Sequence, residues 1–257
     1  MSIPCIIAHR GASATHPENT HAAFDAALAE GCDGIELDVQ LTRDGVPVVY
    51  HDRTLRKSGG GHRPVRRATA AEIARLDAGA WRGARFAGQR VPRLDDVLAR
   101  YARRTTLLLE IKVRPADWRA GVPVALAAAL VHRLRRRRLL RRVLVLCFDL
   151  DTLRLVREDA PAIRTVLNLK APRRITPSLL RALEVVSALS IDVRTISPGI
   201  VAAAHDRGRP VIAYTCNTLR AVRRAAAAGA DGVMSDRPAW LSRVLREATA
   251  DPVGRGR

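Results

Sequence analysis

The chain has 257 residues and a mass of 28.1 kDa, enough for one large domain that folds without metal or disulfide cross-links. Its 44 Lys and Arg residues outnumber its 25 Asp and Glu residues, for a formal net charge of +19 and a pI near 11.4. The 47% content of hydrophobic residues excludes a disordered chain, whereas the charge invites a polyanionic partner such as nucleic acid.

The excess of positive charge consists almost entirely of arginine. Only Lys57, Lys112 and Lys170 are lysines, so 44 minus 3 leaves 41 Arg residues. A GC-rich genome that encodes Arg wherever a surface cation is needed explains this skew more simply than a selected polyanion site. We therefore expect no specific nucleic-acid partner.

Neither a membrane span nor a secretory signal is predicted, because the chain has no run of 18 apolar residues and no basic segment before an apolar one at its start. Four cysteines, none in C-x-x-C spacing, lie in or beside apolar stretches. This pattern predicts reduced core thiols and a cytoplasmic location. They are Cys5, Cys32, Cys147 and Cys216.

Short β-prone runs alternate with Ala/Leu/Arg segments of helical period, which is typical of βα units on a parallel sheet. Predicted strands lie near 4–8, 33–38, 106–111, 143–148, 164–168, 189–193, 211–215 and 232–235. Predicted helices lie near 19–30, 94–103, 123–138, 150–158, 177–186, 199–207, 218–228 and 238–248, with Asn19, Asp149, Thr176 and Asn217 as caps. We predict an α/β fold, a single (β/α)8 barrel over residues 1–249, followed by a flexible tail over 250–257.

The first strand ends in His9-Arg10-Gly11. Catalytic groups of a barrel lie at the C-terminal ends of its strands. A lone His there is more often structural, but the guanidinium of Arg10 suits a phosphate or carboxylate, and Gly11 lets the backbone approach closely. The sequence leaves the structural and the functional interpretations of His9 equally open.

Carboxylates end two of the predicted strands. Glu36 and Asp38 share one face of the second strand, and Glu110 ends an apolar strand with Lys112 two residues later on the same face. Pairing with arginines is the structural alternative, yet three carboxylates that converge on one mouth favour Mg²⁺ or Ca²⁺. Zinc held by the carboxylates, His9 and His51 is a further alternative, although a majority of carboxylates favours a harder ion.

A hairpin follows the second strand. A two-residue turn at Asp44-Gly45 would pair Arg43 with Val46 and bring Asp38 opposite His51, whereas a longer loop would shift this register. Two histidines at one mouth can divide the work of general acid and general base.

Residues 52–93 contain possible short helical turns but no clear βα unit, and we interpret them as an insertion that forms a lid or a small substrate-facing subdomain.

Several motifs occur in order over residues 5–238. They are Ala8-His9-Arg10-Gly11, Pro17-Glu18-Asn19-Thr20, Glu36-Leu37-Asp38-Val39, Asp44-Gly45 with Val48 to Asp52, Leu76-Asp77-Ala78-Gly79, Val91-Pro92, Glu110-Ile111-Lys112, Tyr214-Thr215 with Asn217, and Asp231-Gly232 with Ser235-Asp236. In this order and spacing, the chain resembles the glycerophosphodiester phosphodiesterases, within the wider group of phospholipase-C-like barrel phosphodiesterases.

The resemblance implies a barrel, a divalent cation, and a small glycerophosphodiester substrate that is hydrolysed to sn-glycerol 3-phosphate and an alcohol. By matching motifs it implies an acid/base pair (His9, His51), metal ligands (Glu36, Asp38, Glu110), a phosphate clamp (Arg10, Lys112) and further substrate contacts (Asn19, Tyr214). The family usually has Trp at the position of Tyr214 and Ser at that of Cys147. These departures concern contacts to the alcohol or the glycerol.

Two other functions are compatible with the sequence. A lysophospholipase D or a phospholipase-C-like enzyme would act on membrane lipids and use Trp81 and Phe86 of the insertion for docking. A non-enzymatic polyanion binder would use Arg133, Arg135–Arg138 and Arg141–Arg142, but such helices usually present a solvated face, and interleaved aromatic residues are missing. The two histidines and three carboxylates favour the phosphodiesterase.

Overall fold

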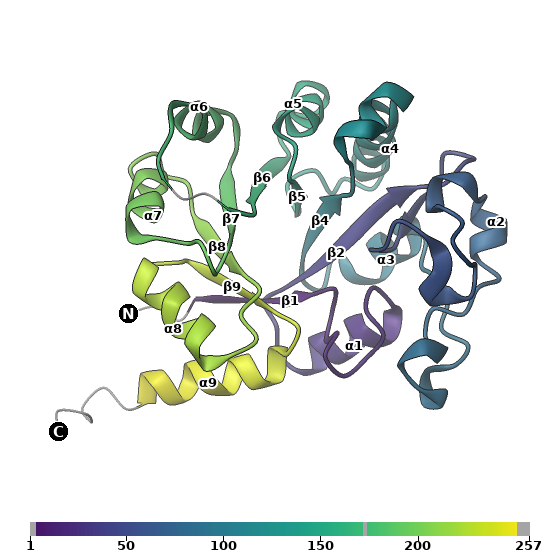
Figure 1. Cartoon of the computed structure of the whole chain (residues 1–257), viewed down its shortest axis with the longest axis horizontal. Helices are drawn as coiled ribbons and strands as arrows, with labels where there is room; N and C mark the ends of the chain where they lie inside the picture. The colour runs from purple at the N-terminus through teal and green to yellow at the C-terminus, as the bar shows by residue number, and fades with distance from the viewer. Residues whose placement is uncertain (1–3, 172–173, 251–257) are drawn as a thin grey trace.

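The computed structural model describes residues 4–171 and 174–250 and shows a closed barrel (Figure 1). Parallel strands follow one another in the order β1-β9-β8-β7-β6-β5-β4-β2, and pairing of β1 with β2 closes the ring. The predicted (β/α)8 fold is confirmed. The barrel strands are β1 (Cys5–His9), β2 (Gly34–Leu41), β4 (Thr106–Ile111), β5 (Val143–Cys147), β6 (Arg164–Leu169), β7 (Ala188–Asp192), β8 (Val211–Tyr214) and β9 (Gly232–Ser235).

Each predicted helix is present and packs on the outside of the barrel. The helices are α1 (His21–Ala29), α3 (Leu94–Tyr101), α4 (Val122–Arg136), α5 (Leu150–Asp159), α6 (Pro177–Val185), α7 (Pro198–His205), α8 (Leu219–Ala228) and α9 (Pro238–Ala250). Asp149 and Thr176 cap α5 and α6 as predicted. The predicted caps Asn19 and Asn217 are wrong, since the adjacent Thr20 and Thr218 cap α1 and α8 and free both amides for contacts at the barrel mouth.

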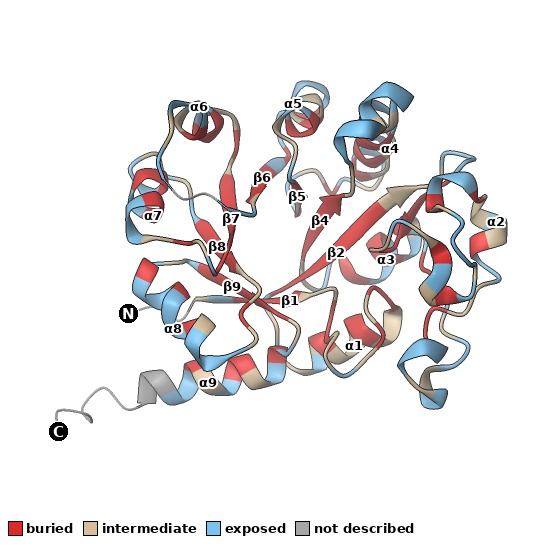
Figure 2. Cartoon of the chain, in the orientation of Figure 1, coloured by how far each residue is buried: buried red, intermediate tan, exposed pale blue. Residues whose placement is uncertain are grey.

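Buried residues line the strands and the inner sides of the helices (Figure 2). The lower interior of the barrel is apolar and includes Ile7 and Leu108. Because side chains of a strand repeat with period two, His9 and Glu110 point inward directly above them. The same two strands thus supply an apolar floor and an ionisable upper layer.

The predicted hairpin forms, but its predicted register is wrong by one residue. Short strand β3 (Pro47–Val49) pairs antiparallel with β2, with Val39 opposite Val49. The loop has three residues, because Val46 donates its N–H to the hydroxyl of Thr42 at 2.9 Å and Gly45 adopts a φ of 73°. The backbone carbonyl of Asp38 therefore accepts the N–H of Tyr50, the neighbour of His51, at 2.9 Å.

The insertion folds around a small apolar core of its own, to which Leu55, Val65 and Ile73 contribute beneath the hairpin residues Val48 and Tyr50. It contains the short helix α2 (Ala70–Ile73) and the 3-10 turns Leu55–Ser58, Val65–Arg67, Ala80–Arg82 and Ala84–Phe86. A further 3-10 turn, Pro115–Ala120, precedes α4. The division into a domain over 1–249 with an insertion at 52–93 stays a prediction.

Three remaining predictions concern the surface and the termini. Cys147 and Cys216 are buried free thiols as expected, but Cys5 is exposed, because it begins β1 at the open lower end of the barrel. Helix α9 ends at Ala250, and the rest of the expected tail lies outside the described residues. Within the described chain, no helix is both long enough and apolar enough to cross a bilayer.

Candidate active site

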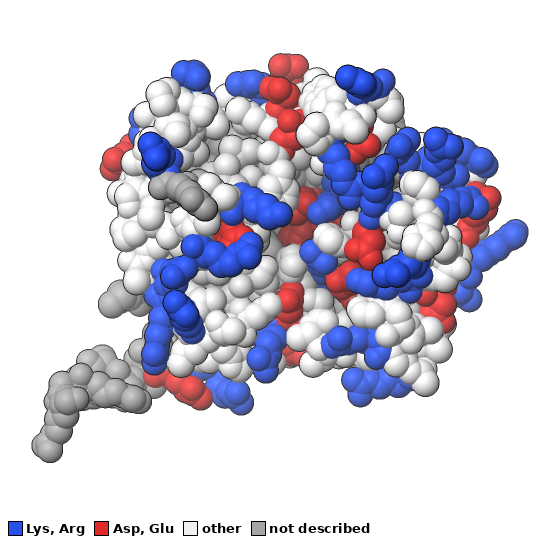
Figure 3. Space-filling model, in the orientation of Figure 1, with Lys and Arg blue, Asp and Glu red and all other residues white. Residues whose placement is uncertain are grey.

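Ionisable side chains gather where three neighbouring strands end. Strand β1 pairs with β2 and places His9 beside Glu36, and β2 pairs with β4 and places Asp38 beside Glu110. Acidic side chains lie near the centre of the face seen in Figure 3, with Lys and Arg side chains around them. The barrel register therefore brings together residues that are far apart in the sequence.

Glu36, Asp38 and Glu110 form what we call the carboxylate cluster. One oxygen of each lies within 4.8 Å of one oxygen of the others, and all three residues are buried. Burial, together with the neighbouring carboxylates, raises the pKa of Glu36 well above its usual value and also raises that of Glu110. Glu36 Oε1 is buried and has no hydrogen-bond partner among the described residues. An unpartnered oxygen among three carboxylates fits a hard divalent cation.

Two cations and one amide hold Asp38. Lys112 Nζ lies 3.2 Å from Asp38 Oδ1 and 2.7 Å from Glu110 Oε1, and Arg10 Nε lies 3.2 Å from Asp38 Oδ2. Asn19 Nδ2 donates to Asp38 Oδ2 at 2.8 Å. Although burial acts in the opposite direction, Lys112 and Arg10 keep the pKa of Asp38 well below its usual value. With two cations against three carboxylates, full ionisation of the cluster leaves one negative charge without a partner.

His9 is held by a residue from the other end of the chain. Its Nδ1 lies 2.6 Å from Asp236 Oδ1, and its Nε2 lies 3.9 Å from Glu36 Oε2. Asp236 also accepts hydrogen bonds from Ser13 Oγ at 3.1 Å and Asn217 Nδ2 at 2.5 Å. These donors outweigh the effect of burial and lower the pKa of Asp236. With Nδ1 directed at Asp236, the Nε2 of His9 faces the carboxylate cluster.

Asp236 was missing from the predicted site residues, although one signal could have found it. It directly follows β9, whose residue Ser235 pairs with Ala8 of β1. In a closed barrel the last strand neighbours the first, so a carboxylate after β9 lies beside a histidine after β1.

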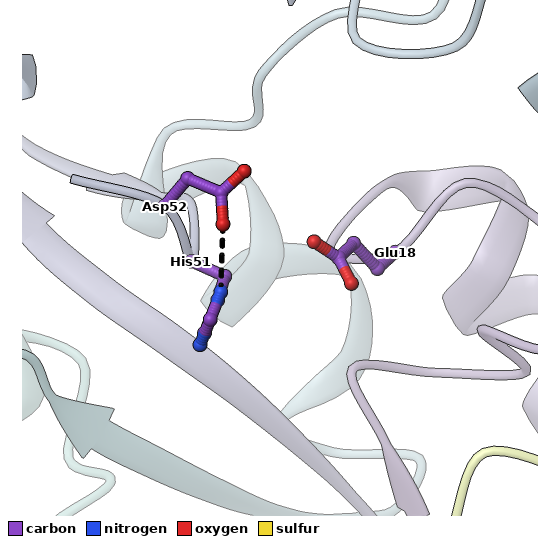
Figure 4. Close-up of side chains that lie close together, drawn as sticks. All are labelled: Glu18, His51 and Asp52. Carbon is purple, nitrogen blue, oxygen red and sulfur yellow. Dashed lines mark hydrogen bonds and ion pairs between the residues drawn. The ribbon is translucent and has the colours of Figure 1, made fainter. Parts of the chain in front are cut away.

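His51 follows β3 and faces a second group of charged side chains. Its Nδ1 lies 3.0 Å from Asp52 Oδ1, and Glu18 faces both of them across the mouth (Figure 4). Lys57 Nζ contacts Glu18 Oε1 at 2.7 Å and Asp52 Oδ2 at 3.6 Å, and Arg10 Nη1 contacts Glu18 Oε2 at 3.0 Å. Because cations already neutralise both carboxylates, we interpret this group as an ion-pair network. Burial, with help from Arg10, lowers the pKa of His51.

A match to the model of a protein family shows which family the chain belongs to. The model of the glycerophosphoryl diester phosphodiesterase family matches residues 9–240. The chain belongs to this family. A glycerophosphodiester phosphodiesterase of Caldanaerobacter subterraneus is 33% identical over 94% of this chain and 98% of its own length.

Solved structures agree with the family assignment. A putative glycerophosphoryl diester phosphodiesterase from Silicibacter pomeroyi is 33% identical and superposes with a TM-score of 0.86 over 96% of this chain and 95% of its own. An Oleispira antarctica phosphodiesterase in complex with the product sn-glycerol-3-phosphate is 28% identical, with a TM-score of 0.83 over 95% of this chain and 97% of its own.

In this member of the glycerophosphoryl diester phosphodiesterase family, Tyr214 lies in the other half of the barrel mouth. Its hydroxyl donates to the carbonyl of Leu169 at 3.1 Å, and its ring stands edge-on to Phe148, with centroids 6.3 Å apart. Asn168, which sequence reasoning also missed, donates to Glu110 Oε2 at 3.2 Å. The described residues offer no ligand group that joins His9 and His51, so the zinc alternative finds no support in the geometry.

Proposed function

We propose that the protein hydrolyses glycerophosphodiesters to sn-glycerol 3-phosphate and an alcohol, with the help of a divalent cation. The observation that carries this proposal is the carboxylate cluster, with its unpartnered Glu36 oxygen, beside two histidines that each contact a carboxylate of their own. The names of the relatives support this activity over action on membrane lipids or polyanion binding. The four free cysteines support a reducing, cytoplasmic setting.

Glu36, Asp38 and Glu110 would hold the cation, and their oxygens suit Mg²⁺ or Ca²⁺. When bound, such a cation stabilises the negative charge that develops on phosphoryl oxygens.

Arg10 and Lys112 would bind the non-bridging oxygens of the phosphodiester. Both are fixed in advance by ion pairs to Asp38, so they need little reorganisation when the charge of the transition state develops. Asn19 would act indirectly, through its hydrogen bonds with Asp38. The phosphate would thus meet two immobilised cations at the rim of the cluster.

The two histidines would act in opposite directions. His51, whose pKa is lowered by burial, is neutral near pH 7 and suited to accept the proton of the nucleophile. His9 would donate a proton from Nε2 to the leaving alkoxide, while Asp236 stabilises the imidazolium through Nδ1. The nucleophile is either the neighbouring glycerol hydroxyl, which gives a cyclic phosphate that water opens, or water itself.

A panel of glycerophosphodiesters and lysolipids, assayed for glycerol 3-phosphate and for free head group, tests the proposal. We expect release of glycerol 3-phosphate that is abolished by EDTA and restored by Mg²⁺ or Ca²⁺. His9→Ala and His51→Ala should each lower kcat by at least about 100-fold and leave metal affinity in place. Full activity after exhaustive chelation, or near-normal turnover by either variant, would contradict the proposed mechanism.

A further inference from the structure

The barrel rim carries a second charged feature, away from the carboxylate cluster. Two adjoining pockets of about 400 and 320 Å³ share Val193 and Arg194. The first lies at the ends of β5 to β8, and the second continues to the start of α8. We call the two pockets the cationic trough, because their charged lining among the described residues consists of Lys170, Arg194, Arg220 and Arg224 with the single carboxylate Asp192.

The single carboxylate of the trough is already bound. Asp192 is buried, and Arg194 holds it through Nε to Oδ1 at 3.0 Å and Nη2 to Oδ2 at 2.5 Å. In the described part of the chain, no carboxylate lies within ion-pair distance of Lys170, Arg220 or Arg224. The trough therefore has an excess of three positive charges, and Figure 3 shows Lys and Arg side chains extending from the centre of the face toward α8.

The trough opens on the same rim as the proposed catalytic groups. Strand β5 neighbours β4, which carries Glu110, and β8 neighbours β9, which precedes Asp236. Tyr214 lines the first pocket, and burial together with the charges of Asp192 and Glu110 raises the pKa of its hydroxyl. A ligand bound at Arg10 and Lys112 thus has the trough directly across the barrel mouth.

The pockets on the two sides of the barrel mouth differ in volume. On the His51 side, Lys57 and Trp81 of the insertion narrow the pocket to about 10 Å³. The trough offers volumes more than tenfold larger and open to solvent. The trough is therefore the side of the mouth with room for an alcohol portion of variable size.

The chemistry of the trough selects for negative charge. Phe148 and Tyr214 provide aromatic faces on which a quaternary ammonium group could pack, but the nearest carboxylate is bound by Arg194 and the other charged neighbours are cations. A choline-like group would be repelled there. A phosphate would instead meet several guanidinium groups, which match its geometry.

We propose that the cationic trough binds an anionic group on the alcohol portion of the substrate, and that the preferred substrates are glycerophosphodiesters whose alcohol carries a second phosphate. This inference rests on the phosphodiesterase activity proposed above. Under this proposal Arg220 and Arg224 select the substrate, whereas the carboxylate cluster and the histidines carry out hydrolysis without them.

A matched pair of substrates isolates the second phosphate. Glycerophosphoglycerol and bis(glycerophospho)glycerol share the scissile linkage, and only the second has an anionic alcohol portion. Because bis(glycerophospho)glycerol has two equivalent scissile bonds, its kcat/KM is halved before the comparison. With saturating Mg²⁺ or Ca²⁺ at low salt, we expect the ratio of this halved value to the kcat/KM of glycerophosphoglycerol to be at least about five. Raising the salt to about 0.3 M should reduce this ratio, because exposed charges are screened.

Substitutions on α8 test whether the arginines of the trough cause this preference. The double substitution Arg220→Gln with Arg224→Gln should lower the ratio toward one, with Lys170 left as the remaining excess charge, whereas Arg223→Gln, on the same helix but outside both pockets, should leave it near the wild-type value. A wild-type ratio near one, or an equal fall in the Arg223 variant, overturns the trough proposal. Absence of turnover of both substrates would instead overturn the phosphodiesterase activity, and the trough proposal with it.

Discussion

The substitution Glu36→Gln distinguishes two interpretations of the carboxylate cluster, a metal site and a structural ion-pair cluster. The substitution keeps the size of the side chain and removes one ionisable group from the carboxylate cluster. Glu36 accepts the N–H of Arg10 at 3.1 Å through Oε2, but Oε1 has no hydrogen-bond partner within the described structure. A carboxamide N–H at this place can donate to Asp38 or Glu110, both within the same 4.8 Å group.

The size of the effect follows from that unpartnered oxygen. A buried polar atom without a partner costs about 1–3 kcal/mol, and 1 kcal/mol shifts the Tm of a domain of this size by about 2 °C. We therefore expect Glu36→Gln to raise the Tm in EDTA by about 2–6 °C. Because the folded-state pKa of Glu36 is raised, the folded wild type binds more protons than the unfolded chain, and its stability falls as the pH rises above about 4.5. The advantage of the variant should thus grow as the pH rises above about 4.5.

Thermal unfolding with EDTA and with saturating Mg²⁺ measures this difference. The wild type should gain stability from Mg²⁺, whereas Glu36→Gln should gain little and lose turnover. Glu18→Gln is a suitable control, because Glu18 contacts Arg10 and Lys57 and its neutralisation should lower the Tm. A lower Tm of Glu36→Gln in EDTA would refute the reasoning and indicate that Arg10 and Lys112 already satisfy the cluster.

Three further predictions follow from particular contacts. Asp236→Asn should lower kcat by about 100-fold and shift the pH–rate profile, since His9 loses its charged partner, while a metal titration should give unchanged affinity; an unaltered profile would contradict this. Gly11→Ala should cost about 2–5 kcal/mol in urea unfolding, because Gly11 has a φ of 83° and a Cβ would lie 2.6 Å from the carbonyl of Ala23. Gly31→Ala, with a φ of 75° but open space, should cost only about 1–2 kcal/mol, and equal costs would argue against the clash. Metal affinity measured by calorimetry should rise with pH with release of protons, since burial raises the pKa of Glu36 and the cation needs its carboxylate form; affinity independent of pH would contradict this.

Much of the barrel could be predicted because each βα unit carries its own signal. Apolar runs, helical periods and caps such as Asp149 are local, and the closed sheet then follows from repetition of the unit. The carboxylate cluster was predictable because period-two alternation places Glu36 and Asp38 on one face of β2, and β2 pairs with β4, which carries Glu110 near its C-terminal end.

The predicted hairpin register and two of the predicted helix caps were wrong because, at each place, a single hydrogen bond determines which of two neighbouring residues takes the role. The hydroxyl of Thr42 supports a three-residue loop and shifts the hairpin by one position. Likewise, Thr20 takes the capping role expected of Asn19. Contacts between distant segments, such as Lys57 with Glu18 across the insertion, have no local signature and required the structure.

The contact between His9 and Asp236 spans 227 positions of the sequence and depends on pairing of the first barrel strand with the last. A chain that has folded every unit except the last lacks the partner of His9. During synthesis, the proposed acid therefore becomes complete only when the final strand docks and seals the ring. Turnover thus reports on completion of the whole fold, and we expect partially assembled barrels to be inactive even where their carboxylates already bind metal.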